Sequence, residues 1–137
     1  MGYCMHLEAT QFHLPKKHFK AALKAIQGLA GKETIRDGGG RHFSWVDSAE
    51  FINATTLEAA LESWRWHPEL DEKGDIVDLQ FEGEKSGDDE ILFGAIAPFV
   101  KEGSYIQMMG EDGHRWRWKF NGKACTEVNS TVVWDDE

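Results

Sequence analysis

The chain has 137 residues, of which 41% are hydrophobic and 28% are charged, and its net charge is −9. This size and apolar content are typical of a single domain with one buried core, and they exclude a disordered chain. The sequence has no apolar run near the roughly 18 residues of a membrane span and no secretory signal pattern. We therefore expect a cytoplasmic protein in which Cys4 and Cys125 are reduced.

The charge is distributed unevenly along the chain. Residues 1–46 carry seven basic and three acidic side chains, residues 47–112 carry four and seventeen, and residues 113–137 carry four of each. This balance argues against direct binding to nucleic acid, because neutralising phosphates requires a dominant basic surface. The acidic middle of the chain either meets a basic partner or, in the simpler interpretation, forms a solvated surface.

In the first third of the chain the apolar spacing predicts a strand, a helix and a second strand. In residues 3–9 larger apolar side chains alternate with the side chains of Cys4, His6 and Glu8, which is typical of a half-buried strand. Residues 16–29 have a helical apolar stripe behind Pro15, which suits a first helical turn. The glycine-rich segment 31–41 lacks the spacing of a phosphate-binding loop and is interpreted as a connector. Residues 42–46 alternate again and are predicted to form a strand.

The middle third predicts two helices and a hairpin. Thr55 and Glu58 have the spacing of a capping box, which indicates a helix beginning there. Residues 64–82 are predicted to form a hairpin in which Pro68 marks a strand end or edge. Ser86 to Asp89 is predicted to open a further helix, with acidic residues at its positive end. The inward-facing residues of the hairpin's second strand are predicted to be Val77, Leu79 and Phe81.

Residues 105–128 are cut by two turn signals into three strands. In the middle strand Trp116, Trp118 and Phe120 alternate with Arg115, Arg117 and Lys119, so one face is aromatic and the other cationic. A three-residue turn ending at Gly113 sets Met108 opposite Trp116 and Ile106 opposite Trp118, with all four on the apolar face. At the second turn, a three-residue loop over 120–122 is slightly favoured and would set Arg115 opposite Glu127.

These elements predict a single α+β domain over residues 1–137, with a largely antiparallel β-sheet and about three helices packed on one face. Four tryptophans are expected in the core, Trp45, Trp64, Trp116 and Trp118, whereas Trp66 and Trp134 are expected to be exposed. The uncovered face of the sheet would carry His6, Glu8, His42, Ser44, Arg65, His67, Asp78, Gln80, Glu82, Arg115, Arg117 and Lys119.

Five candidate binding residues lie on this polar face, namely Arg115, Arg117, Lys119, Arg65 and His67. The sixth is Trp66, which is expected to be exposed. Guanidinium groups suit phosphates, and an indole suits a nucleobase. The simpler interpretation of the same residues is ion pairing with Asp78, Glu82 and Glu127, each pair contributing well under ~1 kcal/mol.

The sequence favours neither metal nor cysteine chemistry. His6, Glu8 and His42, with His67 as a fourth ligand, would be a suitable donor set. No His-x-x-x-His or Cys-x-x-Cys spacing supports it, so we predict no metal and no cofactor. Neither Cys4 nor Cys125 lies in a nucleophile motif, and a small buried thiol is the commoner role. We predict no catalytic residue.

Two motifs carry a resemblance. Gly110-Glu111-Asp112-Gly113 followed by Trp116-Arg117-Trp118-Lys119-Phe120, and His42-Phe43-Ser44-Trp45-Val46-Asp47, are similar to patterns in small uncharacterised acidic proteins of bacteria and their phages. The resemblance implies a cytosolic α+β accessory protein, with a phage or other mobile element as a candidate source. It favours an inhibitor or sequestering role and assigns no residue.

Three hypotheses follow. The first is a non-catalytic protein that engages a protein partner through the polar sheet face and the acidic middle, as inhibitors and immunity proteins do. The second is a binder of an anionic, nucleotide-like small molecule over Arg115 and Arg117. The third is a small metal-assisted enzyme using His6, Glu8 and His42. The oligomeric state is left open.

Overall fold

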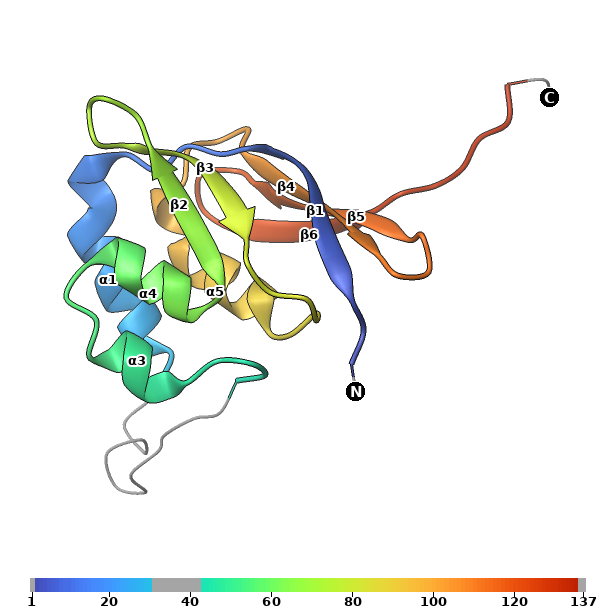
Figure 1. Cartoon of the computed structure of the whole chain (residues 1–137). Helices are drawn as coiled ribbons and strands as arrows, with labels where there is room; N and C mark the ends of the chain where they lie inside the picture. Colours follow the sequence, from blue (N-terminus) through green and yellow to red (C-terminus); the bar gives the residue numbers. More distant parts are fainter. Residues whose placement is uncertain (1, 31–42, 136–137) are drawn as a thin grey trace.

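The computed structural model describes residues 2–30 and 43–135, and these form one α+β domain (Figure 1). Within these residues there are four α-helices and two short 3₁₀ turns: α1 (Phe19–Gly28), α3 (Ser48–Ile52), α4 (Leu57–Ser63), α5 (Asp89–Ile96), η1 (Lys16–His18) and η2 (Ala97–Phe99). The α+β class and its antiparallel pairing are thereby confirmed. No helix in the described residues is long and apolar enough to cross a membrane.

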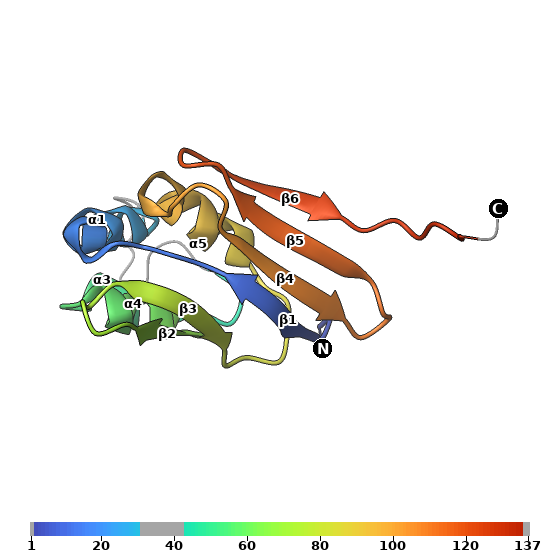
Figure 2. The same ribbon diagram turned by 90° about the horizontal axis from the view of Figure 1, so that it is seen from above.

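The strands form two antiparallel sheets where the sequence suggested one. A four-stranded sheet has the order β1-β4-β5-β6, with β1 (Met5–Gln11), β4 (Tyr105–Gly110), β5 (Arg115–Phe120) and β6 (Cys125–Asn129). The predicted hairpin is confirmed as a separate sheet of β2 (Trp66–Leu70) and β3 (Ile76–Phe81). Figure 2 shows the two sheets side by side, with β1 next to β3.

The two sheets meet along β1 and β3. Leu14 and Ile76 exchange two backbone hydrogen bonds, with N–O distances of 2.9 and 3.0 Å. Further along the same seam the Thr10 hydroxyl donates to the Asp78 carboxylate. The outer edge of β1 is therefore covered by the hairpin. At the opposite end of the four-stranded sheet, β6 pairs only with β5 among the described residues.

The first turn of the C-terminal strands confirms the predicted register. Ile106 faces Trp118 and Met108 faces Trp116, and all four are buried. Gly113 has a φ of +87°, which allows the tight connection without strain from a Cβ atom. The buried face thus fixes the register, since a slip of one residue would expose every one of these side chains.

The predicted second turn is wrong. Trp118, and not Arg115, lies opposite Glu127, and Phe120 lies opposite Cys125. The connection is a four-residue loop organised by Asn121, whose Oδ1 atom accepts hydrogen bonds from the backbone N–H groups of Lys123 and Ala124 at 2.9 and 2.8 Å. An asparagine side chain can replace a backbone acceptor in this way, and here it lengthens the turn.

Two segments depart from simple alternation. Asp78 pairs with Glu69 and Ile76 pairs with Leu70, so Val77 is an extra residue in a bulge and is exposed, contrary to the prediction. The predicted strand at 42–46 is also wrong for the described residues 43–46. They form a tight turn in which Val46 N–H donates to Phe43 O at 3.2 Å.

The core lies where α5 meets both sheets. The Phe93 ring on α5 has its centroid 5.1 Å from Trp66, 5.0 Å from Trp118 and 6.0 Å from Phe120. Trp66 belongs to the hairpin, whereas Trp118 and Phe120 belong to the four-stranded sheet. This aromatic cluster therefore joins the two sheets through one helix, and burying it supplies a large share of the hydrophobic stabilisation.

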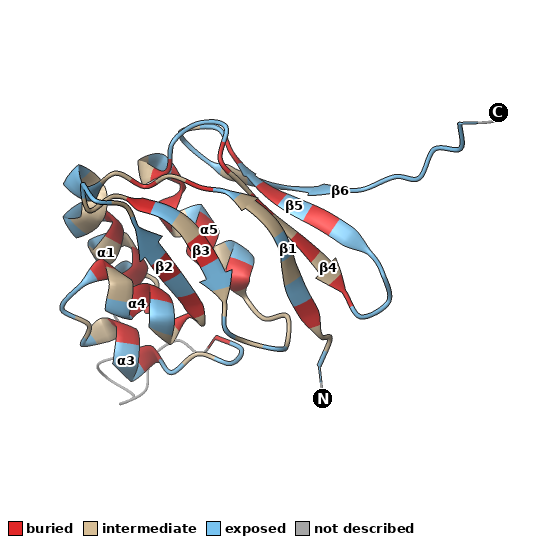
Figure 3. Ribbon diagram, turned by 45° about the horizontal axis from the view of Figure 1, so that its top comes forward, coloured by how far each residue is buried: buried red, intermediate tan, exposed pale blue. Residues whose placement is uncertain are grey.

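The tryptophan predictions have mixed outcomes. Trp64, Trp116 and Trp118 are buried as predicted. Trp45 was expected in the core but is 52% exposed, because it lies in the 43–46 turn with a φ of +66°. Trp66 was expected to be exposed but is fully buried against Phe93. Figure 3 shows the regular part of the pattern on β5, which alternates between buried and exposed residues.

Candidate functional site

The predicted cationic row lies on the outward face of β5. Arg115, Arg117 and Lys119 are all exposed, while the aromatic residues between them are buried. The row exists because a regular strand places alternate side chains on opposite faces. The Lys119 side chain makes no hydrogen bond or ion pair with a residue in the described part of the chain, although its backbone pairs within the sheet. We call Arg115, Arg117 and Lys119 the β5 cationic row.

A short polar network orients the two arginines. Arg115 Nε donates to Glu8 Oε1 at 2.9 Å, and Arg117 Nε donates to Gln107 Oε1 at 2.8 Å. Gln107 Nε2 in turn donates to Glu8 Oε1 at 3.0 Å, and these bonds from Gln107 and Arg115 lower the pKa of Glu8. The Arg117 guanidinium also lies over the Tyr105 ring, 4.5 Å from its centroid.

The expected ion-pair partners of this row are wrong. Asp78 lies in the other sheet and accepts from Thr10, and Glu127 is on the opposite face of β6, where it accepts from Trp118 Nε1 at 3.2 Å. Glu82 forms no ion pair with the row among the described residues. The acid that does pair is Glu8, which alternation had already placed on the polar face, and it reaches Arg115 because β1 lies next to β4.

A shallow cavity of about 270 Å³ lies between the two arginines and the end of β6. Its lining is polar apart from one exposed valine and one tryptophan: Gln107, Arg115, Trp116, Arg117, Val128, Asn129 and Ser130. Each arginine uses its Nε atom in the network described above. In both guanidinium groups the Nη donors therefore have no hydrogen-bond partner within the described residues.

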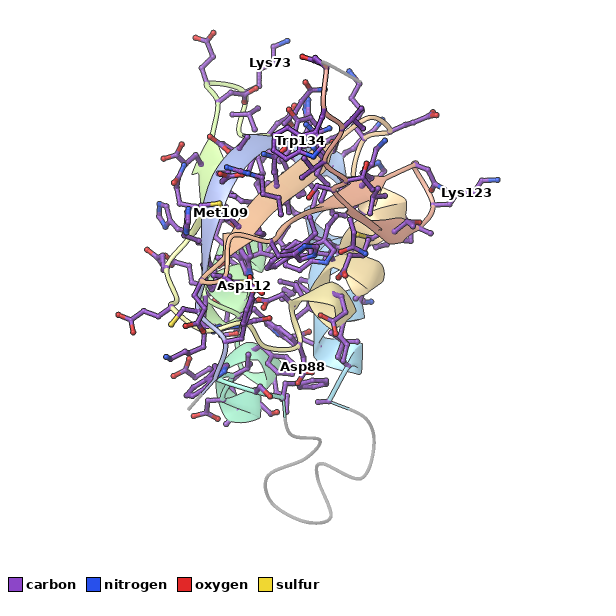
Figure 4. The ribbon with its side chains drawn as sticks, turned by 90° about the vertical axis from the view of Figure 1, so that its right-hand side faces the viewer. Lys73, Asp88, Met109, Asp112, Lys123 and Trp134 are labelled. Atoms are coloured by element: carbon purple, nitrogen blue, oxygen red, sulfur yellow. The ribbon has the colours of Figure 1, made fainter. Side chains whose placement is uncertain are left out.

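The chain leaves this cavity as an exposed apolar segment. Val132, Val133 and Trp134 are 77%, 80% and 71% exposed, so the prediction for Trp134 is confirmed. Figures 1 and 2 show the segment projecting away from the body of the domain beyond β6, and Figure 4 views the molecule from that side with Trp134 labelled. Exposed large apolar residues in a row are typical of an interaction site.

Arg65, Trp66 and His67 do not lie on this face. Arg65 has a φ of +74° and its guanidinium Nη2 is 3.1 Å from Asp89 Oδ2 in a buried ion pair. Trp66 is in the core, where its Nε1 donates to Asp89 Oδ1 at 2.9 Å. His67 is exposed on the hairpin, and its hydrogen bond from Nδ1 to Glu62 raises its pKa. The structure thus groups Arg115, Arg117 and Lys119 and separates the other three candidates.

The metal hypothesis on His6, Glu8 and His42 gains no support from the geometry. His42 lies outside the described residues, and Glu8 is held by Arg115 and Gln107. The one group of three donors found in residues 2–30 and 43–135 is Glu62, His67 and Glu82, whose ligand atoms lie within 4.8 Å of one another. Sequence reasoning placed His67 and Glu82 on the same polar face without grouping them as ligands, and it did not single out Glu62, which comes from a helix.

A second cavity, of about 360 Å³, opens on the inward face beside α5, next to the turn that holds Asp112 (labelled in Figure 4). It is lined by aromatic and acidic residues: Tyr3, Ser86, Glu90, Asp112, His114, Trp116, Trp118 and Glu127. Partial burial, together with the charges of Asp88, Asp89 and Glu127, raises the pKa of Glu90. Local sequence patterns do not predict this cluster, because its residues come from segments that lie far apart along the chain.

The comparisons with known proteins add no functional assignment to this geometry. No protein-family model, no curated protein sequence and no solved structure matches the chain.

Proposed function

We propose that this is a non-catalytic binding protein that engages a protein partner through a surface at the end of the four-stranded sheet. This β6 surface comprises the β5 cationic row, Val128 on the outward face of β6, and the exposed apolar segment 132–134. The observation that carries the proposal is the position of that segment. It follows directly from β6, whose outer edge has no strand partner among the described residues, and it exposes three large apolar side chains in succession.

The free edge suggests how a partner would bind. An extended partner segment could add to β6 as a further strand, with main-chain hydrogen bonds supplying affinity and alternate side chains supplying specificity. On the outward face those side chains would meet Val128 and the neighbouring Arg117, which lie opposite each other in the β5–β6 register. A segment that alternates apolar and acidic residues fits these neighbours.

Electrostatics would favour the same orientation. The whole chain carries a net charge of −9, yet Arg115, Arg117 and Lys119 lie together on one exposed face. An acidic partner is repelled by most of this protein and attracted by the β5 cationic row, which steers its approach and disfavours other orientations. This is the binding mode expected of a small inhibitor or immunity-like protein.

A site-specific photo-crosslinker tests the proposal. It is placed at position 128 on β6 and, as a control, at the exposed Lys20 on α1. In a lysate of the source cells we expect one protein to crosslink from position 128 and not from position 20. Capture should be lost in Arg117→Glu and retained in Arg117→Lys, and calorimetry on the purified pair should reproduce that order.

Two results would contradict binding at the β6 surface. If positions 128 and 20 capture the same proteins, the crosslinking is non-specific. If Arg117→Glu and a chain ending at Ser130 both bind the purified partner with unchanged affinity, the partner uses another surface. Thermal unfolding of each variant separates loss of binding from loss of fold.

The cavity of about 270 Å³ favours a second candidate, an anionic small molecule between Arg115 and Arg117. Two guanidinium groups with free Nη donors suit a phosphate group. Calorimetry with inorganic phosphate and with a nucleoside triphosphate tests this candidate directly. Binding that is lost in both Arg115→Gln and Arg117→Gln would support it, and the absence of binding to either anion would leave the protein-partner proposal.

A further inference from the structure

Three donor side chains converge on the hairpin surface, away from the β6 surface. Glu62 comes from the last turn of α4, His67 is the second residue of β2, and Glu82 follows directly after β3. One ligand atom from each lies within 4.8 Å of the other two, and all three residues are exposed. From this geometry we propose that Glu62, His67 and Glu82 form a binding site for a divalent transition-metal ion, of which Zn²⁺ is the best match.

The backbone, and not flexible loops, brings these donors together. The helix α4 ends at Ser63, and the positive φ of Arg65 turns the chain directly into β2. The N–H group of Glu82 donates to the Arg65 carbonyl at 2.8 Å, which extends the hairpin pairing by one step. Glu62 Oε1 already lies 2.8 Å from His67 Nδ1. The donors therefore need only side-chain rotations to surround an ion.

The donor set has the chemistry of a zinc site. One imidazole nitrogen and two carboxylate oxygens can bind Zn²⁺ at about 2.0–2.2 Å, with water in the fourth tetrahedral position. Mg²⁺ and Ca²⁺ prefer oxygen donors alone and more of them, so a site with an imidazole selects against these ions. Two carboxylates also balance the charge of a divalent ion.

No lysine or arginine competes with an ion for this site. Among the described residues, neither Glu62 nor Glu82 forms an ion pair with a lysine or arginine, and the Glu62 carboxylate contacts only His67, which must give up any proton on Nδ1 to bind a metal. Arg65 is the arginine nearest to these residues along the chain, and its guanidinium group is engaged in the largely buried ion pair with Asp89. A bound ion would link the end of α4 to both strands of the hairpin, and it would stabilise the folded state by mass action.

Calorimetric titration of the chelator-treated full chain with zinc chloride tests this proposal. We expect one ion per chain, a rise in melting temperature with added Zn²⁺, and no comparable heat with Mg²⁺. His67→Ala and Glu82→Gln should each weaken binding by at least about tenfold, the usual cost of losing a metal ligand or its support. Both residues are exposed, so the apo variants should melt like the wild type.

A matched control is Glu69→Gln. Glu69 is also an exposed acid on β2, and its loss changes the charge by the same amount, but it is not one of the three donors. Retained Zn²⁺ affinity in this variant supports a coordinated ion. The proposal fails if the wild type does not bind Zn²⁺, if His67→Ala binds it as tightly, or if Glu69→Gln weakens binding as much as Glu82→Gln does.

Discussion

Arg65 Nη2 lies 3.1 Å from Asp89 Oδ2 in an ion pair whose side chains are only 15% and 1% exposed. Asp89 also accepts hydrogen bonds from Trp66 Nε1 at 2.9 Å and from Gly87 N–H at 3.1 Å. Arg65 in turn donates to the Lys85 carbonyl at 2.6 Å. The Arg65–Asp89 ion pair therefore links the start of the hairpin to the first turn of α5 and to the loop before that helix.

We expect Asp89→Ala to lower the free energy of unfolding by about 3–5 kcal/mol, because the Arg65 charge would remain buried without its partner. Asp89→Asn keeps the shape and one acceptor, so it should cost less. Urea unfolding followed by tryptophan fluorescence measures both, with the exposed Glu84→Gln as control. A loss below about 1 kcal/mol in Asp89→Ala would contradict a structural role for the pair.

The two Trp-Arg-Trp triplets show what the sequence could and could not predict. At 116–118 the triplet lies within a regular strand, so alternation correctly predicts two buried rings and an exposed arginine. At 64–66 the triplet spans the end of α4 and the start of β2, and Arg65 adopts a positive φ. That backbone angle depends on tertiary packing, and it directs Arg65 away from the predicted polar face to a largely buried position beside Asp89.

The same limit applies to the candidate site. The alternation on β5 was enough to place Arg115, Arg117 and Lys119 together on one face. Alternation also placed Glu8 on this face, but its pairing with Arg115 could not be predicted, because it depends on which strand lies beside β4. Strand order and bulges arise from packing between distant segments, and they leave little trace in local sequence patterns.

Glu90 provides a test of the acidic cluster beside α5. Burial and the nearby charges of Asp88, Asp89 and Glu127 raise its pKa, so the folded state holds this proton more tightly than the unfolded state does. That contribution to stability is complete below the unfolded pKa and is lost as the pH rises through the folded pKa. Glu90→Gln should therefore raise the melting temperature at neutral pH.

The gain from Glu90→Gln should disappear below the ordinary glutamate pKa of 4.5. Thermal unfolding at a series of pH values measures this, and Glu102→Gln, an exposed acid outside the cluster, serves as the control. A gain that is constant across the pH range, or equal in the control, would show that Glu90 is not destabilised by its neighbours.

The thiol of Cys125 should be unreactive in the folded protein. Burial, with a contribution from the charge of Glu127, raises the pKa of Cys125 from 9.0 to about 12. A rise of this size lowers the thiolate fraction at neutral pH by a factor of ~10³. In a Cys4→Ser background, iodoacetamide should alkylate the folded protein far more slowly than the urea-unfolded one, as measured by mass spectrometry.

Glu127→Gln should accelerate this alkylation only modestly, because burial is the larger cause of the raised pKa. Equal rates in the folded and unfolded protein would instead place the thiol in solvent. That result would also conflict with the pairing of Phe120 and Cys125 at the start of β6.

Ending the chain at Ser130 should leave the fold intact while removing the apolar end of the β6 surface. The last pairing bond, from Ser130 N–H to the Arg115 carbonyl at 3.1 Å, is retained. Because Val132, Val133 and Trp134 are 71–80% exposed, their loss should change the free energy of unfolding by less than about 0.5 kcal/mol.

The long-wavelength part of the tryptophan emission should also decrease, since Trp134 is the most exposed tryptophan, and the remaining part should come from Trp45. A shorter chain that melts much earlier would show that this segment packs on the domain and is not free for a partner. With an unchanged melting temperature, any loss of partner binding can be attributed to the segment itself, since the sheet and its cationic row remain in place.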